Sequence, residues 1–286
     1  MNILNIPNWV NQYNFTYNSF EEIPDEVFDG INLKLDKIIK DEPEVSILIS
    51  AWNEEVNILK CIAALANINT SFPLEIIVIN NNSDDKTQKT LDKLNVKNFF
   101  QGIQGWGPAR QLAQEKAKGK YILLADADCL YPDCWVDEMM KVLKQPDVVC
   151  VYGRYSFIPE DRYPRWKLFL LESLKDMIAE VRHFKRPYLN AFGISMGYVK
   201  ELGLRVGFVM HKVRGEDGRL CFDLMKYGKI KQVKATKARA WTGPRTLDKD
   251  GGFGKALSAR IFKELGRVTS MFKPLKPHDT KTSSND

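Results

Sequence analysis

Residues 119–133 read GKYILLADADCLYPD, and two features of this stretch decide the fold. Four consecutive apolar residues, beginning at Tyr121, are typical of a buried strand in a parallel sheet. Asp126 and Asp128 then place two like charges where that strand ends. On an extended backbone, such carboxylates point to the same side about 6.5 Å apart. Their repulsion costs about 2–3 kcal/mol at an effective dielectric constant of about 20.

A hard divalent cation held between these carboxylates and phosphate oxygens removes the cost of placing them together. Ala127, between the two aspartates, is small enough to let a diphosphate approach. Parallel sheets bind their ligands beyond the carboxyl ends of their strands, which is where the aspartates fall. The stretch therefore predicts a cation and diphosphate site at the edge of a parallel sheet.

Other apolar runs predict that strands and helices alternate along the first half of the chain. The expected strands are VSILIS (45–50), LEIIVIN (74–80), a weaker VKNFFQGI (96–103), KYILLAD (120–126) and DVVCVYG (147–153). Helical patterns fall between them at 53–68, 83–94, 107–119 and 132–145. This alternation predicts an α/β fold with a mainly parallel central sheet and helices on both of its faces.

After residue 153 the alternation stops. A long amphipathic helix is expected over 165–184, and the stretch NAFGISMGYVKELG (190–203) is expected to be rich in loops. The segment GEDGRLCFDLMKYG (215–228) predicts a loop that leads into a helix, and KIKQVKATKARAWTG (229–243) predicts edge strands.

Composition excludes several classes of protein. The net charge of +6 comes from 42 basic and 36 acidic residues with no dense basic run, so nucleic acid is not an expected partner. Five cysteines without a C-x-x-C pair indicate reduced core thiols rather than a zinc site. There is no signal-peptide pattern, and no apolar run approaches the roughly 20 residues that span a bilayer. We expect a cytoplasmic protein, with peripheral contact to the inner face of the plasma membrane left open.

Four motifs occur in order along the chain: VSILISAWNEEVNILKCIAAL (45–65), EIIVINNNSDDKT (75–87), GPARQLAQEKAKGKYILLADADC (107–129) and GEDGRL (215–220). Together, over about residues 45–245, the chain resembles the family 2 glycosyltransferases of the GT-A fold. The resemblance implies an inverting enzyme that transfers a sugar from a nucleotide diphosphate sugar to a hydroxyl of a saccharide or a lipid-linked acceptor. It also implies a Mn²⁺ or Mg²⁺ cofactor and a place in cell-surface polysaccharide or lipopolysaccharide biosynthesis.

The resemblance assigns residues to the donor. Ser50 stands where the family usually has proline. The residues implied to contact the nucleotide sugar are Ala51, Asn53, Glu54, Asn81, Arg110, Asp126 and Ala127. Family members commonly carry an acidic residue where this chain has Asn81, which therefore leaves the base open between UDP, the default, and GDP. An amide can still read a pyrimidine edge, because it both donates and accepts hydrogen bonds. Asp128 is the implied metal ligand, and Asp126 holds the ribose or a metal-bound water.

The resemblance also assigns the reaction itself. Inverting transfer needs a carboxylate that takes the proton of the acceptor hydroxyl. The family's Glu-Asp pair matches Glu216 and Asp217, with Asp217 as the base and Glu216 orienting the acceptor. Gly193, Ser195 and Trp241 are candidate acceptor contacts, and Trp241 is expected on a mobile loop with Arg245.

These assignments divide the chain into four parts. Residues 1–43 form an N-terminal extension packed on the core, 44–153 the nucleotide-sugar-binding half, and 154–250 the acceptor-binding and catalytic half. Residues 251–286 are expected to form an amphipathic helix and a flexible tail. The basic face of that helix would suit an anionic membrane, although a helix docked on the body fits the same pattern.

Two other functions remain open from the sequence. One is a phosphohydrolase that uses the D-x-D pair as nucleophile and acid, although its pair would be expected after the first strand rather than the fourth. The other is a non-catalytic nucleotide-binding or scaffold protein, which would not need Asp217. Taken without their neighbours, D-x-D also fits a solvated loop, and GEDG fits a polar turn.

Overall fold

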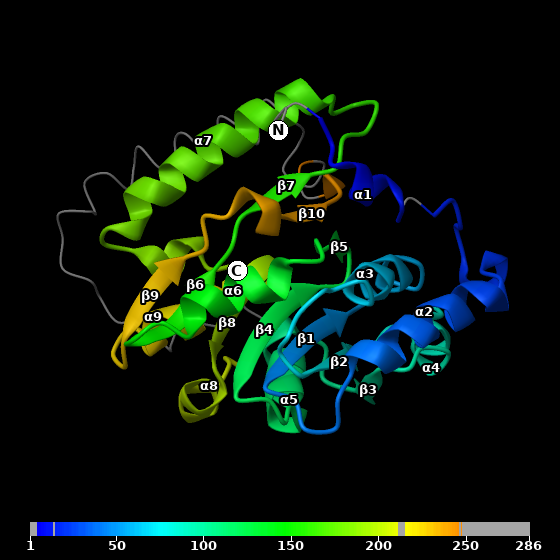
Figure 1. Ribbon diagram of the computed structural model, residues 1–286, viewed down its shortest axis with the longest axis horizontal. Coiled ribbons are helices and arrows are strands. Elements are labelled where there is room, and N and C mark those ends of the chain that lie inside the picture. Colours follow the sequence, from blue (N-terminus) through cyan, green and yellow to red (C-terminus); the bar gives the residue numbers. More distant parts are fainter. Residues whose placement is uncertain (1–4, 14, 211–214, 246, 248–286) are drawn as a thin grey trace.

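The computed structural model describes residues 5–13, 15–210, 215–245 and 247, and its centre is a seven-stranded sheet (Figure 1). The strand order is β3-β2-β1-β4-β8-β6-β9. The strands are β1 Val45–Ala51, β2 Leu74–Asn80, β3 Lys97–Phe100, β4 Tyr121–Asp126, β6 Val148–Tyr152, β8 Met196–Val199 and β9 Lys229–Gln232. Neighbours in the run from β3 to β4 are parallel, and so are β6 and β9. The predicted mainly parallel α/β sheet is confirmed.

The two central strands are apolar because both of their faces are covered. Every residue of β1 and β2 is buried. Along β1, Ile47 and Ile49 enter one hydrophobic cluster and Leu48 enters the cluster on the opposite face. A strand that is covered on both faces is expected to read as a continuous apolar run. For this reason the sequence locates these strands well.

Helices cover both faces of the sheet. One hydrophobic cluster includes residues of α1 Asn8–Asn11, α2 Asp25–Ile38, α3 Asn57–Leu65, α4 Thr87–Asp92 and α6 Trp135–Leu143. The other includes residues of α5 Trp106–Lys116, α8 Lys200–Val206 and α9 Glu216–Leu224. Short 3₁₀ turns occur at η1 Phe20–Glu22, η2 Pro187–Asn190, η3 Gly193–Ser195 and η4 Thr236–Ala238.

A second, three-stranded sheet lies beside the main one, with α7 Arg165–His183 running over it (Figure 1). Its order is β5 Cys129–Leu130, β10 Ala240–Thr242 and β7 Tyr155–Phe157. The prediction of edge strands over 229–243 is therefore right for β9 but wrong for β10, which is the central strand of the small sheet. The two-residue β5, which pairs with β10, is too short to leave a pattern in the sequence.

The stretch 190–203, expected to be rich in loops, contains the strand β8. It runs antiparallel to β4 and to β6 and separates them. Gly197 is needed there, because a Cβ atom at this position would lie 2.6 Å from Leu123 Cδ2. A four-residue strand with a central glycine resembles a loop in sequence, which explains the wrong prediction.

The proposed division into four parts stays a prediction. α2, in the proposed extension, contributes Phe28, Ile31 and Leu35 to the main hydrophobic cluster. The predicted C-terminal amphipathic helix lies outside the described residues. Among the residues that the structure describes, no helix combines the length and the apolar character needed to span a membrane.

Two glycines provide a matched test of the packing. A Cβ atom at Gly119 would lie 2.7 Å from the Ser46 backbone nitrogen, whereas one at Gly30, within α2, meets no atom within 4 Å. We expect Gly119→Ala to lower the free energy of unfolding by about 1–3 kcal/mol, because backbone must shift. Gly30→Ala should raise it by about 0.5–1 kcal/mol through helix propensity. Chemical denaturation measures both, and equal effects would contradict the packing described here.

Candidate active site

The carboxyl ends of three parallel strands meet at one edge of the main sheet. β1 ends at Ala51, β2 at Asn80 and β4 at Asp126, and Ser50 pairs in register with Asp126. The loops that follow β1 and β2 are tied together by Asn53, which has a left-handed backbone (φ 54°). Its N–H donates to Ser83 Oγ at 3.0 Å, and its Oδ1 accepts from the Asp84 N–H at 3.0 Å.

The D-x-D stretch has a different backbone from the one expected. β4 ends at Asp126, Ala127 and Asp128 form a turn, and β5 begins at Cys129. The assumption of one extended strand is therefore wrong, because the backbone turns at these two residues before β5 pairs with β10. The turn nevertheless gathers the groups: one potential ligand atom from each of Asp126, Asp128 and Cys129 lies within 4.8 Å of the others. Two carboxylates at this separation fit a hard divalent cation.

Arg110, on the first turns of α5, is the buried cation of the site. Its guanidinium Nη1 donates to Glu216 Oε1 at 2.6 Å and also to Asp217 Oδ1, and Nη2 lies 3.4 Å from Asp126 Oδ1. Arg110 is only 6% exposed. One arginine therefore joins the D-x-D stretch to the Glu-Asp pair, which is more than 100 residues from Arg110 in the sequence.

The Glu-Asp pair lies in the first turn of α9 rather than in the tight loop expected from its flanking glycines. Gly215 precedes the helix with a left-handed backbone (φ 97°), and Gly218 is inside the helix. A Cβ atom at Gly218 would lie 2.9 Å from the Tyr188 carbonyl oxygen, so this glycine serves packing. Asp217, 7% exposed, also accepts a hydrogen bond of 2.7 Å from the N–H of Gly193.

Burial and neighbouring charges set the acidities in this network. Burial raises the pKa of Asp217, and Arg110 opposes this by favouring the carboxylate. Burial likewise raises the pKa of Asp126, to about 7. Arg110 opposes this rise, and the charge of Asp128 adds to it. Burial by itself would lower the pKa of Arg110, but Asp217, Glu216 and Asp126 together raise it. Arg110 is therefore a permanent cation, and Asp126 and Asp217 beside it hold protons more readily than exposed carboxyl groups.

A second arginine contacts the acidic cluster, which consists of Glu54, Asp126 and Asp128. Arg245, just beyond β10, places Nη2 2.6 Å from Glu54 Oε1 and 2.7 Å from Asp128 Oδ2. Burial raises the pKa of Glu54, and the hydrogen bond from Arg245 opposes the rise. Glu54 is further fixed by the Asn57 amide, which donates to it at 2.6 Å, and by its own N–H, which donates to Thr87 Oγ1 at 2.9 Å.

The remaining predicted donor residues are buried beside this cluster. Ala51 and Ala127 are both buried. Asn81 is also buried, and its Oδ1 accepts a hydrogen bond of 3.0 Å from the N–H of Gly105, the residue before α5. Asn81 therefore fixes the loop that leads to Arg110. Its contact with a base stays a prediction.

Two predicted acceptor residues lie inside the fold. Ser195 is buried and accepts a hydrogen bond of 3.0 Å from Trp135 Nε1. Trp241 belongs to β10, is buried, and packs with the guanidinium carbon of Arg165 5.2 Å from its ring centroid. The expectation of a mobile loop at Trp241 is therefore wrong, because a strand pair on each side holds it. Of the three, only Gly193 lies at the Arg110 network.

Two residues at the site were not predicted to act there. The Ser50 hydroxyl is buried and has no hydrogen-bond partner among the described residues. The departure from the family's usual proline marked this position in the sequence. The Tyr131 hydroxyl accepts from the Asp126 N–H at 2.8 Å and donates to the Ile194 carbonyl at 2.9 Å, so it holds the end of β4. No sequence pattern points to Tyr131.

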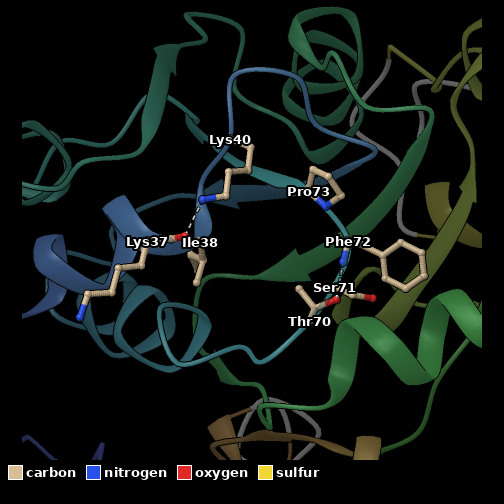
Figure 2. Close-up of a pocket in the computed structure, with 7 residues that line it drawn as sticks. All are labelled: Lys37, Ile38, Lys40, Thr70, Ser71, Phe72 and Pro73. Carbon is tan, nitrogen blue, oxygen red and sulfur yellow. Dashed lines mark hydrogen bonds between the residues drawn. The ribbon is translucent and has the colours of Figure 1, made fainter.

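Figure 2 shows a pocket elsewhere on the molecule, of about 230 Å³. It is lined by Lys37, Ile38, Lys40, Thr70, Ser71, Phe72 and Pro73. These residues precede β1 and β2, at the amino ends of the parallel strands. The pocket is therefore at the edge of the sheet opposite to the acidic cluster, and it contains none of the predicted site residues.

A mainly parallel α/β sheet with acidic residues at the carboxyl ends of its strands is the arrangement that the resemblance to the GT-A fold implied. Residues 46–202, more than half of the chain, match the family model described as Glycosyl transferase family 2. The chain belongs to this family, which confirms the resemblance and the enzyme class that it implied.

Sequence relatives cover different shares of the chain. An uncharacterized glycosyltransferase of Haemophilus influenzae is 30% identical over 122 residues, which are 40% of this chain and 48% of that protein. Hyaluronan synthase of Pasteurella multocida is 27% identical over 217 residues, which are 70% of this chain and 22% of the synthase. The chain thus spans about half or less of the length of these relatives.

Solved structures share the fold. Mannosyltransferase PcManGT from Pyrobaculum calidifontis, in complex with GDP-Man and Mn²⁺, gives a TM-score of 0.53 at 16% identity over 77% of this chain and 68% of that one. Glucosyl-3-phosphoglycerate synthase from Mycobacterium tuberculosis, in complex with phosphoglyceric acid, gives a TM-score of 0.53 at 17% identity over 84% of both chains. These likenesses confirm the GT-A fold.

The Arg110 network predicts a pH-dependent defect. Arg110→Met leaves three carboxyl groups without their shared cation, so we expect a loss of about 3–5 kcal/mol in the free energy of unfolding at pH 8. The loss should shrink toward pH 5, because carboxyl groups whose pKa is raised in the folded state take up protons and cease to repel one another. Denaturation at both pH values measures it. Arg205→Met, which removes an exposed ion pair with Glu201 on α8 and the contact of the guanidinium with the Tyr227 ring, is the control. A defect independent of pH would contradict this role for Arg110.

Proposed function

We propose that the protein is a metal-dependent, inverting glycosyltransferase that transfers a sugar from a nucleotide diphosphate sugar to an acceptor hydroxyl. The observation that carries the proposal is the connection from Asp126 through the buried Arg110 to Asp217. It brings the predicted donor side and the predicted base into one network at the ligand-binding edge of the sheet. GT-A relatives solved with GDP-Man and Mn²⁺, and with UDP, GalNAc and Mn²⁺, support a donor of this kind.

Asp217 is the proposed base. Its carboxylate would accept the proton of the acceptor hydroxyl as that oxygen attacks the sugar. A raised pKa makes it a better proton acceptor than an exposed aspartate, and Arg110 with the Gly193 N–H fixes its orientation. In this proposal Glu216 shares Arg110 and so orients the base and the acceptor.

On the donor side, Asp128 and Asp126 are the proposed ligands of Mn²⁺ or Mg²⁺. Their oxygens are the donors that such cations prefer, and a bound cation would stabilise the charge that develops on the leaving diphosphate. In the structure, Arg245 pairs with Asp128, so the guanidinium of Arg245 balances the charge of this carboxylate. Ala51, Asn53, Glu54 and Asn81 are the proposed nucleotide contacts.

We propose a UDP-sugar as the donor, with a GDP-sugar as the alternative. The acceptor would be a saccharide or a lipid-linked saccharide in cell-surface polysaccharide or lipopolysaccharide assembly. The similarity to hyaluronan synthase supports a saccharide acceptor. Peripheral membrane contact through the C-terminal amphipathic helix stays a prediction, because that segment is outside the described residues.

Substitution of the base tests the proposal. We expect Asp217→Asn to lower sugar transfer at least about 100-fold, the scale of general-base catalysis, while UDP or GDP with Mn²⁺ still raises the melting temperature. Release of the nucleoside diphosphate from a panel of UDP- and GDP-sugars measures transfer. In the native chain the transfer rate should fall as the pH is lowered. The fall should begin above pH of about 3.9, the ordinary aspartate pKa, because the pKa of Asp217 is raised.

Asp223→Asn, further along α9, is the matched control for the base and should transfer at the native rate. Near-native transfer by Asp217→Asn would reject the base assignment. Donor binding without transfer in the native chain, for every donor and acceptor tried, would favour the scaffold alternative. Release of phosphate rather than a nucleoside diphosphate would favour the phosphohydrolase.

A second experiment addresses the metal. A ligand that binds only the folded state raises the melting temperature by mass action, so we expect UDP or GDP to stabilise the native chain more with Mn²⁺ than with chelator. Asp128→Asn should remove most of this Mn²⁺-dependent increment. Asp133→Asn, an exposed aspartate five residues away, should retain it. If Asp128 only pairs with Arg245, its substitution will lower the melting temperature equally with and without Mn²⁺, and the ligand assignment fails.

A further inference from the structure

The outer face of α7 carries a series of large apolar side chains, interrupted by one exposed polar residue, Ser173. Its exposed large side chains recur at helical spacing and are 49–60% exposed: Trp166, Leu170, Met177 and Val181. Phe184, 91% exposed, continues the series as the residue directly after the helix. By contrast, the fully buried apolar residues of this helix are Leu168 and Leu171. An amphipathic helix of a soluble domain normally turns its apolar side inward. α7 therefore exposes more large apolar residues than it buries.

The series of exposed apolar residues is long. From Trp166 to Phe184 it extends about 27 Å at 1.5 Å per residue. Phe169, Leu174 and Ile178 are half-buried on its flanks and widen it. Single exposed apolar residues are ordinary on a protein surface, but a continuous patch of several hundred Å² marks an interaction site. Figure 1 shows α7 at the periphery of the fold, over the small sheet and away from the body of the main one.

The charges around this face are predominantly positive. Residues 165–186 contain six basic and three acidic residues. Each acid is already neutralised by a basic group: Glu172 by Arg165, Asp176 by Arg239, and Glu180 by Lys234. Lys167 and Lys185 border the face, and Lys185 is exposed. An apolar face with a basic border and paired acids fits a partner that is apolar within and anionic at its surface.

Other candidate occupants lack this complementarity. A second copy of the chain would bring the same basic border against the first. The C-terminal sequence of this chain, residues 251–276, contains six basic residues and one acidic residue, so it too is positive. An anionic lipid surface satisfies both requirements, because its headgroups attract lysines while its acyl region accepts apolar side chains.

We infer that α7 is an interfacial helix that lies on an anionic phospholipid bilayer, with Trp166, Met177 and Phe184 entering the headgroup–acyl boundary. The surface is separate from the proposed active site and does not depend on the proposed function. Membrane contact through α7 would place the enzyme on the lipid surface by a described element of the fold rather than by the C-terminal sequence.

Vesicle co-sedimentation of the full chain tests this inference. We expect the native chain to pellet with vesicles of phosphatidylcholine and phosphatidylglycerol, and less with phosphatidylcholine alone. The double variant Met177→Gln/Phe184→Ser should bind at least about tenfold more weakly, a difference that corresponds to about 1.4 kcal/mol. Lys167→Gln/Lys185→Gln should weaken binding only to the anionic vesicles. Leu33→Ser, which removes a 66% exposed leucine from α2, should bind like the native chain.

Thermal unfolding of each variant checks that the fold is retained, as expected for substitutions of exposed side chains. The inference fails if the native chain stays in the supernatant with anionic vesicles. It also fails if the α7 double variant pellets like the native chain, because the binding then belongs to another segment. A native dimer in light scattering that the double variant converts to monomer would assign the face to a second copy and reject the lipid partner.

Discussion

A single buried positive charge, the guanidinium of Arg110, is the constraint on which the site depends. It holds Asp126 at the end of β4 and both acids at the start of α9, so three elements from distant parts of the chain share one counter-ion. Such a cluster is costly to desolvate and yet cannot lose one member without leaving others uncompensated. The guanidinium also explains the glycine at position 193, because a Cβ atom there would overlap it. The positions of the loops around the acids are thus set by one ionic centre.

The strand ends supply the second level of organisation. Because β1, β2 and β4 are parallel and in register, the polar residues that follow them reach the same edge. Side chains then lock the loops: Asn53 joins the loops after β1 and β2, Asn81 holds the start of α5, and Tyr131 holds the end of β4. The short β10 brings Arg245 to the same edge from the far end of the described chain. The site is therefore built on strand ends and helix starts, with two arginines, Arg110 and Arg245, paired to the acidic cluster.

The strands that carry the site could be predicted because they are buried on both faces and leave unbroken apolar runs, as in β1, β2 and β4. The acidic residues could be identified because charges following such runs are unusual. β8 could not be predicted, since its central glycine serves close packing against Leu123 and resembles a loop in sequence. The partners of Arg110 could not be predicted either, because an ion pair between residues 110 and 217 leaves no local pattern. The position of Trp241 inside a sheet could not be predicted, because β5 and β7, the strands that pair with it, are only two and three residues long.

The antiparallel β8 also affects how the chain must fold. It lies between β4 and β6, so the sheet stays divided until residues 196–199 are inserted. An emerging polypeptide that ends near residue 153 would expose the open edges of both strands, and such edges invite pairing with other chains. Long-range closures of this kind slow folding. During synthesis on the ribosome, the main sheet therefore cannot form completely until β8 has been made. A fragment that ends near residue 153 should aggregate rather than fold as an independent domain.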